Sequence, residues 1–404
     1  MKYILEERIG NPNLFCGRDE EMSLLLAWAS RIPKKISKSQ AILGRRKSGK
    51  TAIMQRLFNL LWNKNGPVVP FYFEVQDKDI WLLEFARNYF YTFLSQYFSF
   101  VLRTPLPIHN TYLEWNDLVR MAEKHGNEDV IHQMEVFKIY ENNESAEQAI
   151  EFAFGAPANF YGFTGKFFIV MIDEIQYMTE HIYYDKEKTI KERTLPGAFH
   201  GLVELKIAPM LVAGSYIGWM TQMMQKMFVG SRLRPFPISP KLDFKGGMEA
   251  VYKYAEHYDI TVTEEIALVI NSIVQSDPFY MTALFNSPVQ DFSSADDVIK
   301  TFINEITNKK GELYLTWMEY INISLNKVND RYGKHILLIL SENRHKEMAR
   351  DEILDQLGWS NPLFGFLKKH PLFGFLKKHT DITANIHLVA TVVTSSLIYA
   401  ITFN

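Results

Sequence analysis

The residues best suited to do chemistry lie in the stretch ILGRRKSGKT, residues 42–51, where Gly44 is followed after four residues by Gly49, Lys50 and Thr51. Glycines at these positions let the backbone curl so that its N–H groups face an anion, and a helix starting here adds its positive end. The lysine suits nucleotide phosphates and the threonine hydroxyl suits magnesium. The pattern therefore predicts a phosphate-binding loop. Its expected nucleotide contacts are Gly44, Lys47, Ser48, Gly49, Lys50, Thr51 and Ala52.

A loop of this kind needs a second strand that ends in carboxylates, and KFFIVMIDEIQYM supplies one. The unbroken apolar run Phe167–Ile172 is typical of a central parallel strand covered on both faces. Asp173 follows at the carboxyl end, where ligands bind in open α/β sheets, and we expect it to hold magnesium together with Thr51. Glu174 is the candidate general base for an attacking water. The alternative is that both carboxylates only cap the following helix.

A third apolar run, Met210–Ala213, ends in Gly214 and Ser215. A polar residue at this strand end is expected close to the γ-phosphate, beside Asp173 and Thr51, so Ser215 is the candidate sensor of that phosphate. The alternative is an N-capping serine at the start of the next helix. The two roles are compatible.

The elements that must position these residues follow from hydrophobic periodicity. Residues 39–44 predict a short buried strand, residues 51–62 an amphipathic helix, and residues 68–75 another strand of the same sheet. These elements indicate an α/β fold with a parallel sheet flanked by helices. The aromatic stripe in residues 89–98 has two interpretations: a buried helix face, which we expect, or a platform for stacking bases.

Six short motifs occur in a fixed order along the chain: FCGRDEE, GRRKSGKT, MIDEIQ, LVAGS, VGSRLRPFPISP and SDPFYM. In this order they resemble the archaeal-type P-loop ATPase family, an AAA+ and STAND-like family related to the origin-recognition initiator ATPases. The resemblance covers residues 10–290 well and residues 310–370 loosely. It implies ATP as the nucleotide, magnesium as the metal, and an AAA+-like sheet followed by a helical lid and a C-terminal winged-helix-like domain.

The resemblance also implies roles for residues outside the loop. Phe15 and Arg18 would line the side of the nucleotide base, and Pro278 would shape the lid beside the nucleotide. Arg232 would contact the γ-phosphate, in cis or from a neighbouring molecule, with Arg234 as the second choice.

The chain departs from the family pattern at two of these motifs. Ser231 separates Gly230 from Arg232, where the family usually has a Gly-Arg pair, so Arg232 has a surface position before an edge strand as its alternative. Ser276 replaces the usual glycine two residues before Pro278, and this motif contains no arginine. The second sensor arginine of many AAA+ proteins is therefore not expected here.

The expected domains are an ATPase domain over residues 1–240, a helical lid over 241–310 and a winged-helix-like domain over 311–404. Residues 331–380 contain nine Lys/Arg against five Asp/Glu, an excess of four positive charges. Such a face suits DNA phosphates, although a winged helix can also serve as an internal hinge. The nonapeptide PLFGFLKKH occurs twice in tandem, at 362–370 and 371–379. We interpret it as a local duplication that distorts the winged helix.

Composition excludes several other classes of protein. The 404 residues carry a net charge of -2, so there is no general nucleic-acid signature, and the single Cys16 excludes an intrachain disulfide and a cysteine-based zinc site. The apolar residues 387–404 favour buried strands over a membrane tail because Thr and Ser interrupt them. We therefore expect a cytoplasmic protein without a membrane partner.

The sequence predicts an ATP-binding, magnesium-dependent ATPase that works as a nucleotide-driven conformational switch with slow hydrolysis. Two alternatives stay open. One is a nucleotide-regulated DNA-binding protein that uses the C-terminal winged helix. The other is a signalling scaffold with a protein partner or a homo-oligomer.

Overall fold

The computed structural model describes residues 2–105, 112–215, 217–226, 232–326, 339, 342–343, 348 and 350–357. The chain divides into two compact units. The first comprises Met1–Lys253 and Ser276–Pro278, and the second comprises Tyr254–Gln275 and Phe279–Asn404.

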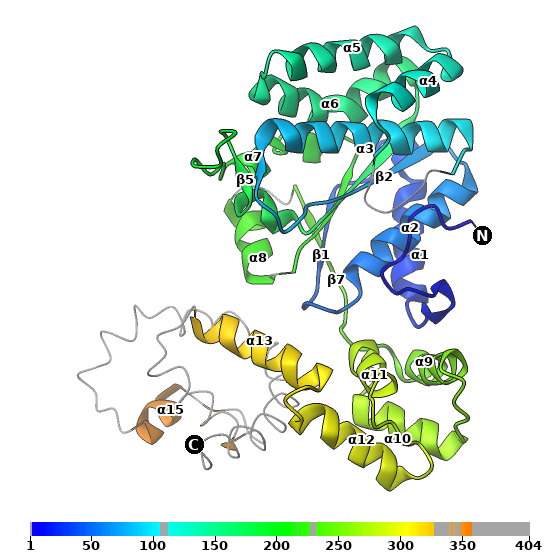
Figure 1. The fold of residues 1–404 in the computed structure, drawn as a ribbon, viewed down its shortest axis with the longest axis vertical. Helices are drawn as coiled ribbons and strands as arrows, with labels where there is room; N and C mark the ends of the chain where they lie inside the picture. Colours follow the sequence, from blue (N-terminus) through cyan, green and yellow to red (C-terminus); the bar gives the residue numbers. More distant parts are fainter. Residues whose placement is uncertain are drawn as a thin grey trace. The chain divides into compact units, whose positions relative to one another are not determined.

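A five-stranded sheet forms the centre of the first unit (Figure 1). Across the sheet its strands are β2 (Val68–Glu74), β4 (Phe167–Asp173), β6 (Met210–Ala213), β1 (Gln40–Leu43) and β7 (Arg234–Pro237). Every neighbouring pair is parallel, so all carboxyl ends lie at one edge of the sheet. The apolar runs of β4 and β6 are buried, as expected for strands covered on both faces. The predicted α/β fold is confirmed.

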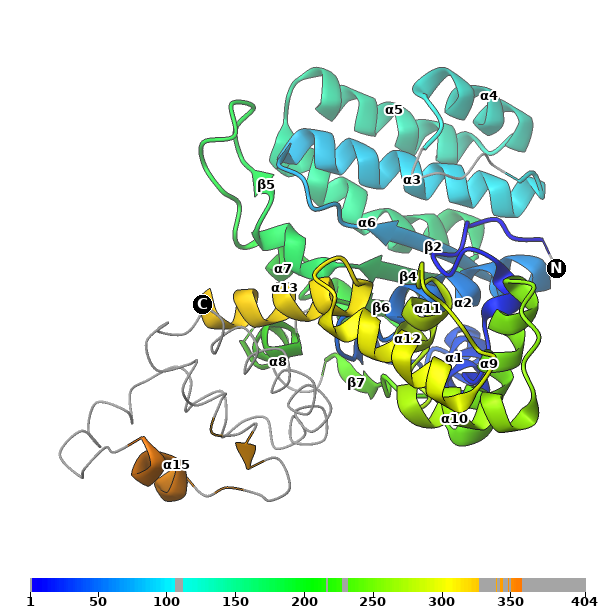
Figure 2. The ribbon, with the colours of Figure 1, turned by 60° about the horizontal axis from the view of Figure 1, so that its bottom comes forward.

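The two faces of the sheet are covered by helices from different connections. The chain passes from β1 through α2 (Lys50–Lys64) to the edge strand β2, and then returns through further helices to β4. Because such crossovers are right-handed, the outward and the return connections lie on opposite faces. Figure 2 shows this arrangement. The return connection consists of α3 (Leu82–Leu102), α4 (Trp115–His125), α5 (Glu128–Asn142) and α6 (Ala146–Thr164).

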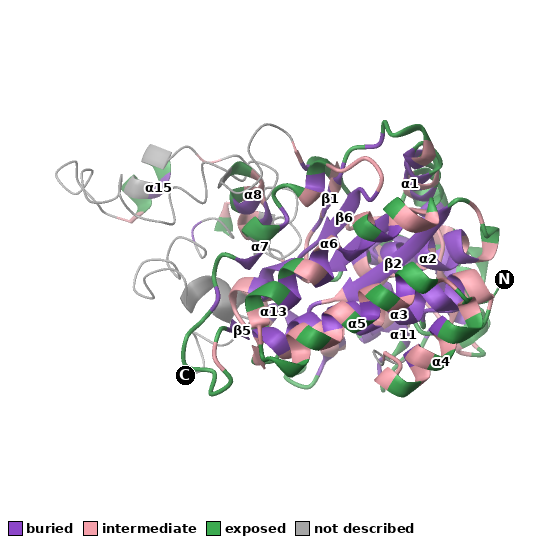
Figure 3. Cartoon of the chain, turned by 90° about the horizontal axis from the view of Figure 1, so that it is seen from above, coloured by how far each residue is buried: buried purple, intermediate pink, exposed green. Residues whose placement is uncertain are grey.

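The aromatic stripe of α3 belongs to the core. Tyr89, Phe90, Phe93, Tyr97 and Phe98 are all buried, and they contact aromatic rings of β2, β4 and the helices α5 and α6. The buried colouring in Figure 3 runs through these helices and the strands. The expectation of a core stripe over a stacking platform is confirmed.

Smaller elements complete the first unit. They are η1 (Pro12–Leu14), α1 (Asp19–Ser30), η2 (Ile32–Lys34), the short pair β3 (Ile80–Trp81) and β5 (Ile182–Tyr183), η3 (Ile175–Thr179), α7 (Leu195–Ala198), η4 (Leu202–Glu204), α8 (Ile217–Lys226) and most of α9 (Phe244–His257).

The second unit is helical in the part that the structure describes. Its helices are α10 (Glu264–Val274), α11 (Pro278–Phe285, without its first residue), α12 (Ala295–Thr307), α13 (Glu312–Asn326) and α15 (Arg350–Gln356). The stretch 241–310, expected as a helical lid, contains α9 to α12. The duplicated nonapeptide, the C-terminal apolar segment and most of the winged-helix prediction lie outside the described residues. No described helix is long and apolar enough to span a membrane.

Candidate phosphate and magnesium site

The loop between β1 and α2 has the backbone that its glycines predicted. Gly49 has a φ of +85°, in the left-handed region that favours glycine. Gly44 is needed for space, since a Cβ there would lie 2.6 Å from Ser48 Oγ and 2.8 Å from Ile238 Cγ1. The first N–H groups of α2 have no partner within their own helix and are available to an anion.

Lys50 is buried at the start of α2. Its Nζ donates to the carbonyl oxygens of Gly44, at 3.1 Å, and Arg45, at 2.8 Å, so the ammonium group binds the backbone of the loop itself. Burial lowers the pKa of Lys50, against the nearby negative charges of Asp173 and Glu174.

Thr51 and Asp173 meet across the loop, as the sequence predicted. The Thr51 hydroxyl donates to Asp173 Oδ2 at 2.6 Å, and Asp173 Oδ1 accepts the main-chain N–H of Glu174 at 2.9 Å. Asp173 is fully buried, which raises the pKa of its carboxyl group. A hydroxyl and a carboxylate are hard oxygen ligands of the kind that magnesium prefers. The described residues contain no group of three or more His, Cys, Asp or Glu arranged for a metal. A magnesium ion here would therefore need phosphate or water as further ligands.

Glu174 lies between the ends of β4 and β6. Ser215 Oγ donates to its Oε1 at 2.7 Å, and the side-chain amide of Gln176 donates to its Oε2. Its φ of 52° is left-handed, which is uncommon for a residue other than glycine and is often found at functional sites. Glu174 stands at the N-cap of η3 but makes no capping hydrogen bond with its side chain. The structure thus brings the predicted base and sensor together and gives no support to a capping role for Glu174.

Several solved structures of other proteins are similar to this chain. The chain is similar to the Walker-type ATPase PABY2304 of Pyrococcus abyssi, with a TM-score of 0.50 and 14% identity over 90% of each chain. The chain has the fold of a Walker-type P-loop ATPase. It also matches the ORC2 protein of Aeropyrum pernix in its ADP form (TM-score 0.43, 15% identity, 87% of this chain and 82% of that one). A third match is the Aeropyrum pernix ORC1 protein in complex with DNA (0.42, 10%, 86% and 85%). No family model and no curated protein matches.

Within this P-loop ATPase fold, Arg18 supports the phosphate loop directly. It is buried at the start of α1 and donates to the carbonyl oxygens of Ser48, at 3.3 Å, and Ser239, at 2.7 Å. Phe15 lies beneath the guanidinium group of Arg56, whose Cζ is 4.3 Å from the centroid of the Phe15 ring. Arg18 therefore borders the loop and Phe15 borders the helix α2 that follows it, and the contact of both with a nucleotide base stays a prediction.

Pro278 begins α11, and the residue before it makes a contact that the sequence did not suggest. Asp277 is buried and forms an ion pair with Arg45 of the phosphate loop. The segment Ser276–Pro278 belongs to the first unit, while the residues on both sides of it belong to the second. The phosphate loop is therefore tied to the chain segment that joins the units.

Arg232 lies away from the phosphate loop of its own chain. Arg234 is paired with Gln40 at the amino end of β1. Arg232 therefore lies at the amino ends of the strands, whereas the phosphate loop lies at their carboxyl ends. Arg232 contacts Glu204, at 2.8 Å from Nε, and His200. Arg232 thus does not reach the phosphate loop of its own chain, and a contact with the loop of a neighbouring molecule stays a prediction.

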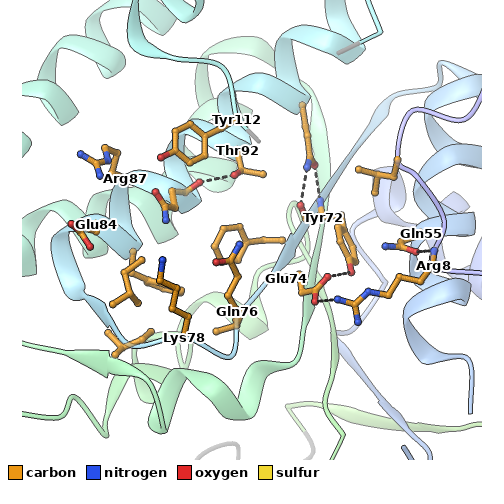
Figure 4. Close-up of a pocket in the computed structure, with 18 of the residues that line it drawn as sticks. Arg8, Gln55, Tyr72, Glu74, Gln76, Lys78, Glu84, Arg87, Thr92 and Tyr112 are labelled. Carbon is orange, nitrogen blue, oxygen red and sulfur yellow. Dashed lines mark hydrogen bonds and ion pairs between the residues drawn. The ribbon is translucent and has the colours of Figure 1, made fainter. Parts of the chain in front are cut away.

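Tyr72 and Glu74 extend the site in a direction that the sequence did not predict (Figure 4). Glu74 is paired in register with Asp173, and the Tyr72 hydroxyl donates to Asp173 Oδ2 at 3.2 Å and to Glu74 Oε2 at 3.4 Å. Burial raises the pKa of both Tyr72 and Glu74. Arg8 forms an ion pair with Glu74. The signal in the sequence was Glu74 itself, a carboxylate at the end of a strand.

A cavity of about 630 Å³ adjoins these residues. Its wall includes the N-terminal segment at Arg8, the carboxyl end of β2 at Glu74, and α3 at Arg87 and Thr92, as Figure 4 shows. Its lining carries charges of both signs, and two of its lining residues adjoin Asp173: Tyr72 through a hydrogen bond and Glu74 through strand pairing.

Proposed function

We propose that the protein binds ATP with magnesium, hydrolyses it slowly and uses the cycle as a conformational switch. The observation that supports this best is the convergence of five side chains at neighbouring strand ends. Lys50 and Thr51 follow β1, Asp173 ends β4 with Glu174 directly after it, and Ser215 follows β6.

The residues present fit a nucleotide phosphate group. Ser48 Oγ is buried and has no hydrogen-bond partner within the part of the chain that the structure describes. Gly44 keeps open the space that a Cβ would fill. Thr51 and Asp173 provide the oxygen atoms for magnesium, which supplies positive charge against the phosphate oxygens when bound. Lys50 would exchange its two loop carbonyls for phosphate oxygens.

The residues around the expected water explain both turnover and its slowness. The Glu174 carboxylate can accept a proton from water, and Ser215 and Gln176 hold its two oxygens in place. Slow hydrolysis is expected because Arg232, the arginine that the resemblance assigns to the γ-phosphate, does not reach the loop of its own chain.

The switch role is supported by the ion pair between Arg45 and Asp277. An anion bound at the loop lies near Arg45 and competes with Asp277 for its charge. The segment Ser276–Pro278 continues into α11, so a change at Asp277 is transmitted along the chain to the helices of the second unit. Contacts with a γ-phosphate commonly bias two-state elements in this way.

The test begins with ATP binding by the full chain, measured by calorimetry, for wild type and Lys50→Ala. Loss of the ammonium contacts with phosphate is expected to weaken binding about tenfold to a hundredfold. Lys64→Ala, at the exposed end of the same helix, is the matched control and should bind like wild type. Single-turnover hydrolysis by Glu174→Gln should then be slower than wild type. Equal binding and hydrolysis by Lys50→Ala would refute the site.

DNA binding is the second candidate function, and it rests on the excess of four positive charges in residues 331–380. We propose that this segment, as part of the C-terminal domain, contacts DNA phosphates. Neutralising Lys368, Lys369, Lys377 and Lys378 together should abolish binding to a DNA duplex at low salt. No binding by wild type at low salt would remove this candidate.

A further inference from the structure

Gln176 is a buried side chain in the acidic motif, and the proposed reaction uses only one of its two hydrogen bonds, the one with Glu174. It lies in η3, two residues after Glu174. Its Nε2 donates to Glu174 Oε2, and its Oε1 accepts the main-chain N–H of Ser215 at 3.3 Å. Ser215 Oγ donates in turn to Glu174 Oε1 at 2.7 Å. The three residues close a ring of hydrogen bonds between the ends of β4 and β6.

Gly214 leaves the space that the amide of Gln176 occupies. A Cβ on Gly214 would lie 2.6 Å from Gln176 Oε1 and 2.8 Å from Met220 Sδ. A buried amide without partners is costly, so Gln176 is stable here because both of its ends are bonded.

We propose that Gln176 is a positioning residue, whose amide holds the carboxylate of Glu174 and the turn at Ser215 as one unit. The inference rests on the proposed ATP hydrolysis. Glu174 has to face the attacking water, and Ser215 follows the strand end next to the phosphate loop. Because Gln176 bonds both, a displacement of the turn at Ser215 is passed to the orientation of Glu174.

The chemistry requires an amide at this position. Gln176 donates at one end and accepts at the other, which a glutamate, with acceptors only, cannot do beside the Glu174 carboxylate. Methionine has a similar length and neither group. Neither replacement alters Lys50 or Thr51, so both should slow hydrolysis while nucleotide affinity is preserved.

The experiment compares Gln176→Met and Gln176→Glu with Asn59→Leu in the full chain. Asn59 is a matched control, because it is also a buried amide with both ends bonded. Its Oδ1 accepts the main-chain N–H groups of Ile4 and Leu5 at 2.8 Å, and its Nδ2 donates to the carbonyl oxygen of Leu5 at 2.9 Å. We expect single-turnover hydrolysis to fall about tenfold or more in both Gln176 variants, with the Kd for a fluorescent ATP analogue within about twofold of wild type. Asn59→Leu should lower the unfolding temperature and keep the hydrolysis rate.

Two double-variant cycles complete the test. In a Glu174→Gln background, Gln176→Met should slow hydrolysis little further, because it acts through Glu174. In nucleotide-free protein, Gln176→Met and Ser215→Ala should be non-additive in thermal unfolding, since they belong to one ring.

The proposal is overturned by additive unfolding effects, or by a loss of nucleotide affinity that equals the loss of rate. It is also overturned if Asn59→Leu slows hydrolysis as much as Gln176→Met. If wild type does not hydrolyse ATP, the proposed function fails, and the unfolding cycle still decides whether Gln176 holds Ser215 and Glu174 together.

Discussion

Replacing Asp173 by asparagine should stabilise the nucleotide-free protein while it impairs the binding of magnesium and ATP. Asp173 is fully buried and accepts three hydrogen bonds, from the Thr51 hydroxyl, the Tyr72 hydroxyl and the main-chain N–H of Glu174. An asparagine of the same shape can keep all three. Its Oδ1 accepts the N–H, and the two hydroxyls can rotate to accept from its Nδ2.

The size of the stabilisation by Asp173→Asn follows from two opposing contributions to the free energy of unfolding. Burying a carboxylate charge costs several kcal/mol, about 5. Each hydrogen bond weakens by about 1 kcal/mol when the charged carboxylate is replaced by a neutral amide. The weakening of three bonds therefore offsets about 3 kcal/mol of the gain from removing the charge. The difference is a stabilisation of about 2 kcal/mol. The raised pKa of Asp173 agrees with this direction, because it means that the folded site disfavours the charged form of the carboxyl group.

Thermal unfolding with a chelator and without nucleotide measures this effect. For domains of 150–250 residues, about 2 kcal/mol corresponds to a rise of about 4–8 °C at neutral pH. Because the folded pKa of Asp173 is raised, the protonated group stabilises the fold below its unfolded pKa of about 3.9, and this stability is lost as pH rises through the folded pKa. The advantage of Asp173→Asn should therefore shrink as the pH is lowered.

Asp277→Asn is the contrasting variant. Asp277 is also a buried aspartate, but it forms an ion pair with Arg45, so loss of its charge should destabilise the protein by about 1–3 kcal/mol. ATP with magnesium should raise the unfolding temperature of wild type much more than that of Asp173→Asn. A lower unfolding temperature for nucleotide-free Asp173→Asn would refute the reasoning about the buried charge.

Three further predictions concern the surroundings of the site. Gly44→Ala places a methyl group against Ser48 Oγ and should lower stability by about 1–3 kcal/mol, measured by urea unfolding, and weaken ATP binding. Glu7→Gln breaks the buried ion pair with Arg56 and should cost about 3 kcal/mol in the same assay; no loss would show that the pair is not buried in solution. Burial raises the pKa of the Cys16 thiol to about 11 from 9.0, so it should react with iodoacetamide at pH 8 about a hundredfold more slowly than the unfolded chain in urea; equal rates would contradict this.

The parts of the site that the sequence predicted are those encoded in short, continuous stretches. The pairing of Thr51 with Asp173 and of Glu174 with Ser215 follows from where each motif ends its strand, and parallel strands bring such ends together. The sheet and its burial followed from apolar runs of the strands in the same way. Local pattern and strand polarity were sufficient for both.

The contacts that escaped prediction depend on register and long-range packing. Tyr72 reaches Asp173 only because β2 is paired with β4 at Glu74, and no local pattern fixes that pairing. Asp277 meets Arg45 across 232 positions of the chain. Gln176 was visible in its motif, but its role depends on the turn at Ser215. A single sequence gives no means of pairing such residues.

The hydrogen bonds within the site indicate how the same residues can serve two states. Lys50 bonds loop carbonyls, Thr51 bonds Asp173, and Ser215 bonds Glu174, so the groups expected to meet phosphate or magnesium already have partners inside the protein. Binding must exchange these bonds for others, which reduces affinity but leaves no buried polar group unpaired when phosphate departs. Two alternative bonding patterns of comparable completeness are what a switch requires. An enzyme selected for rapid turnover would not need a second pattern that competes with its substrate.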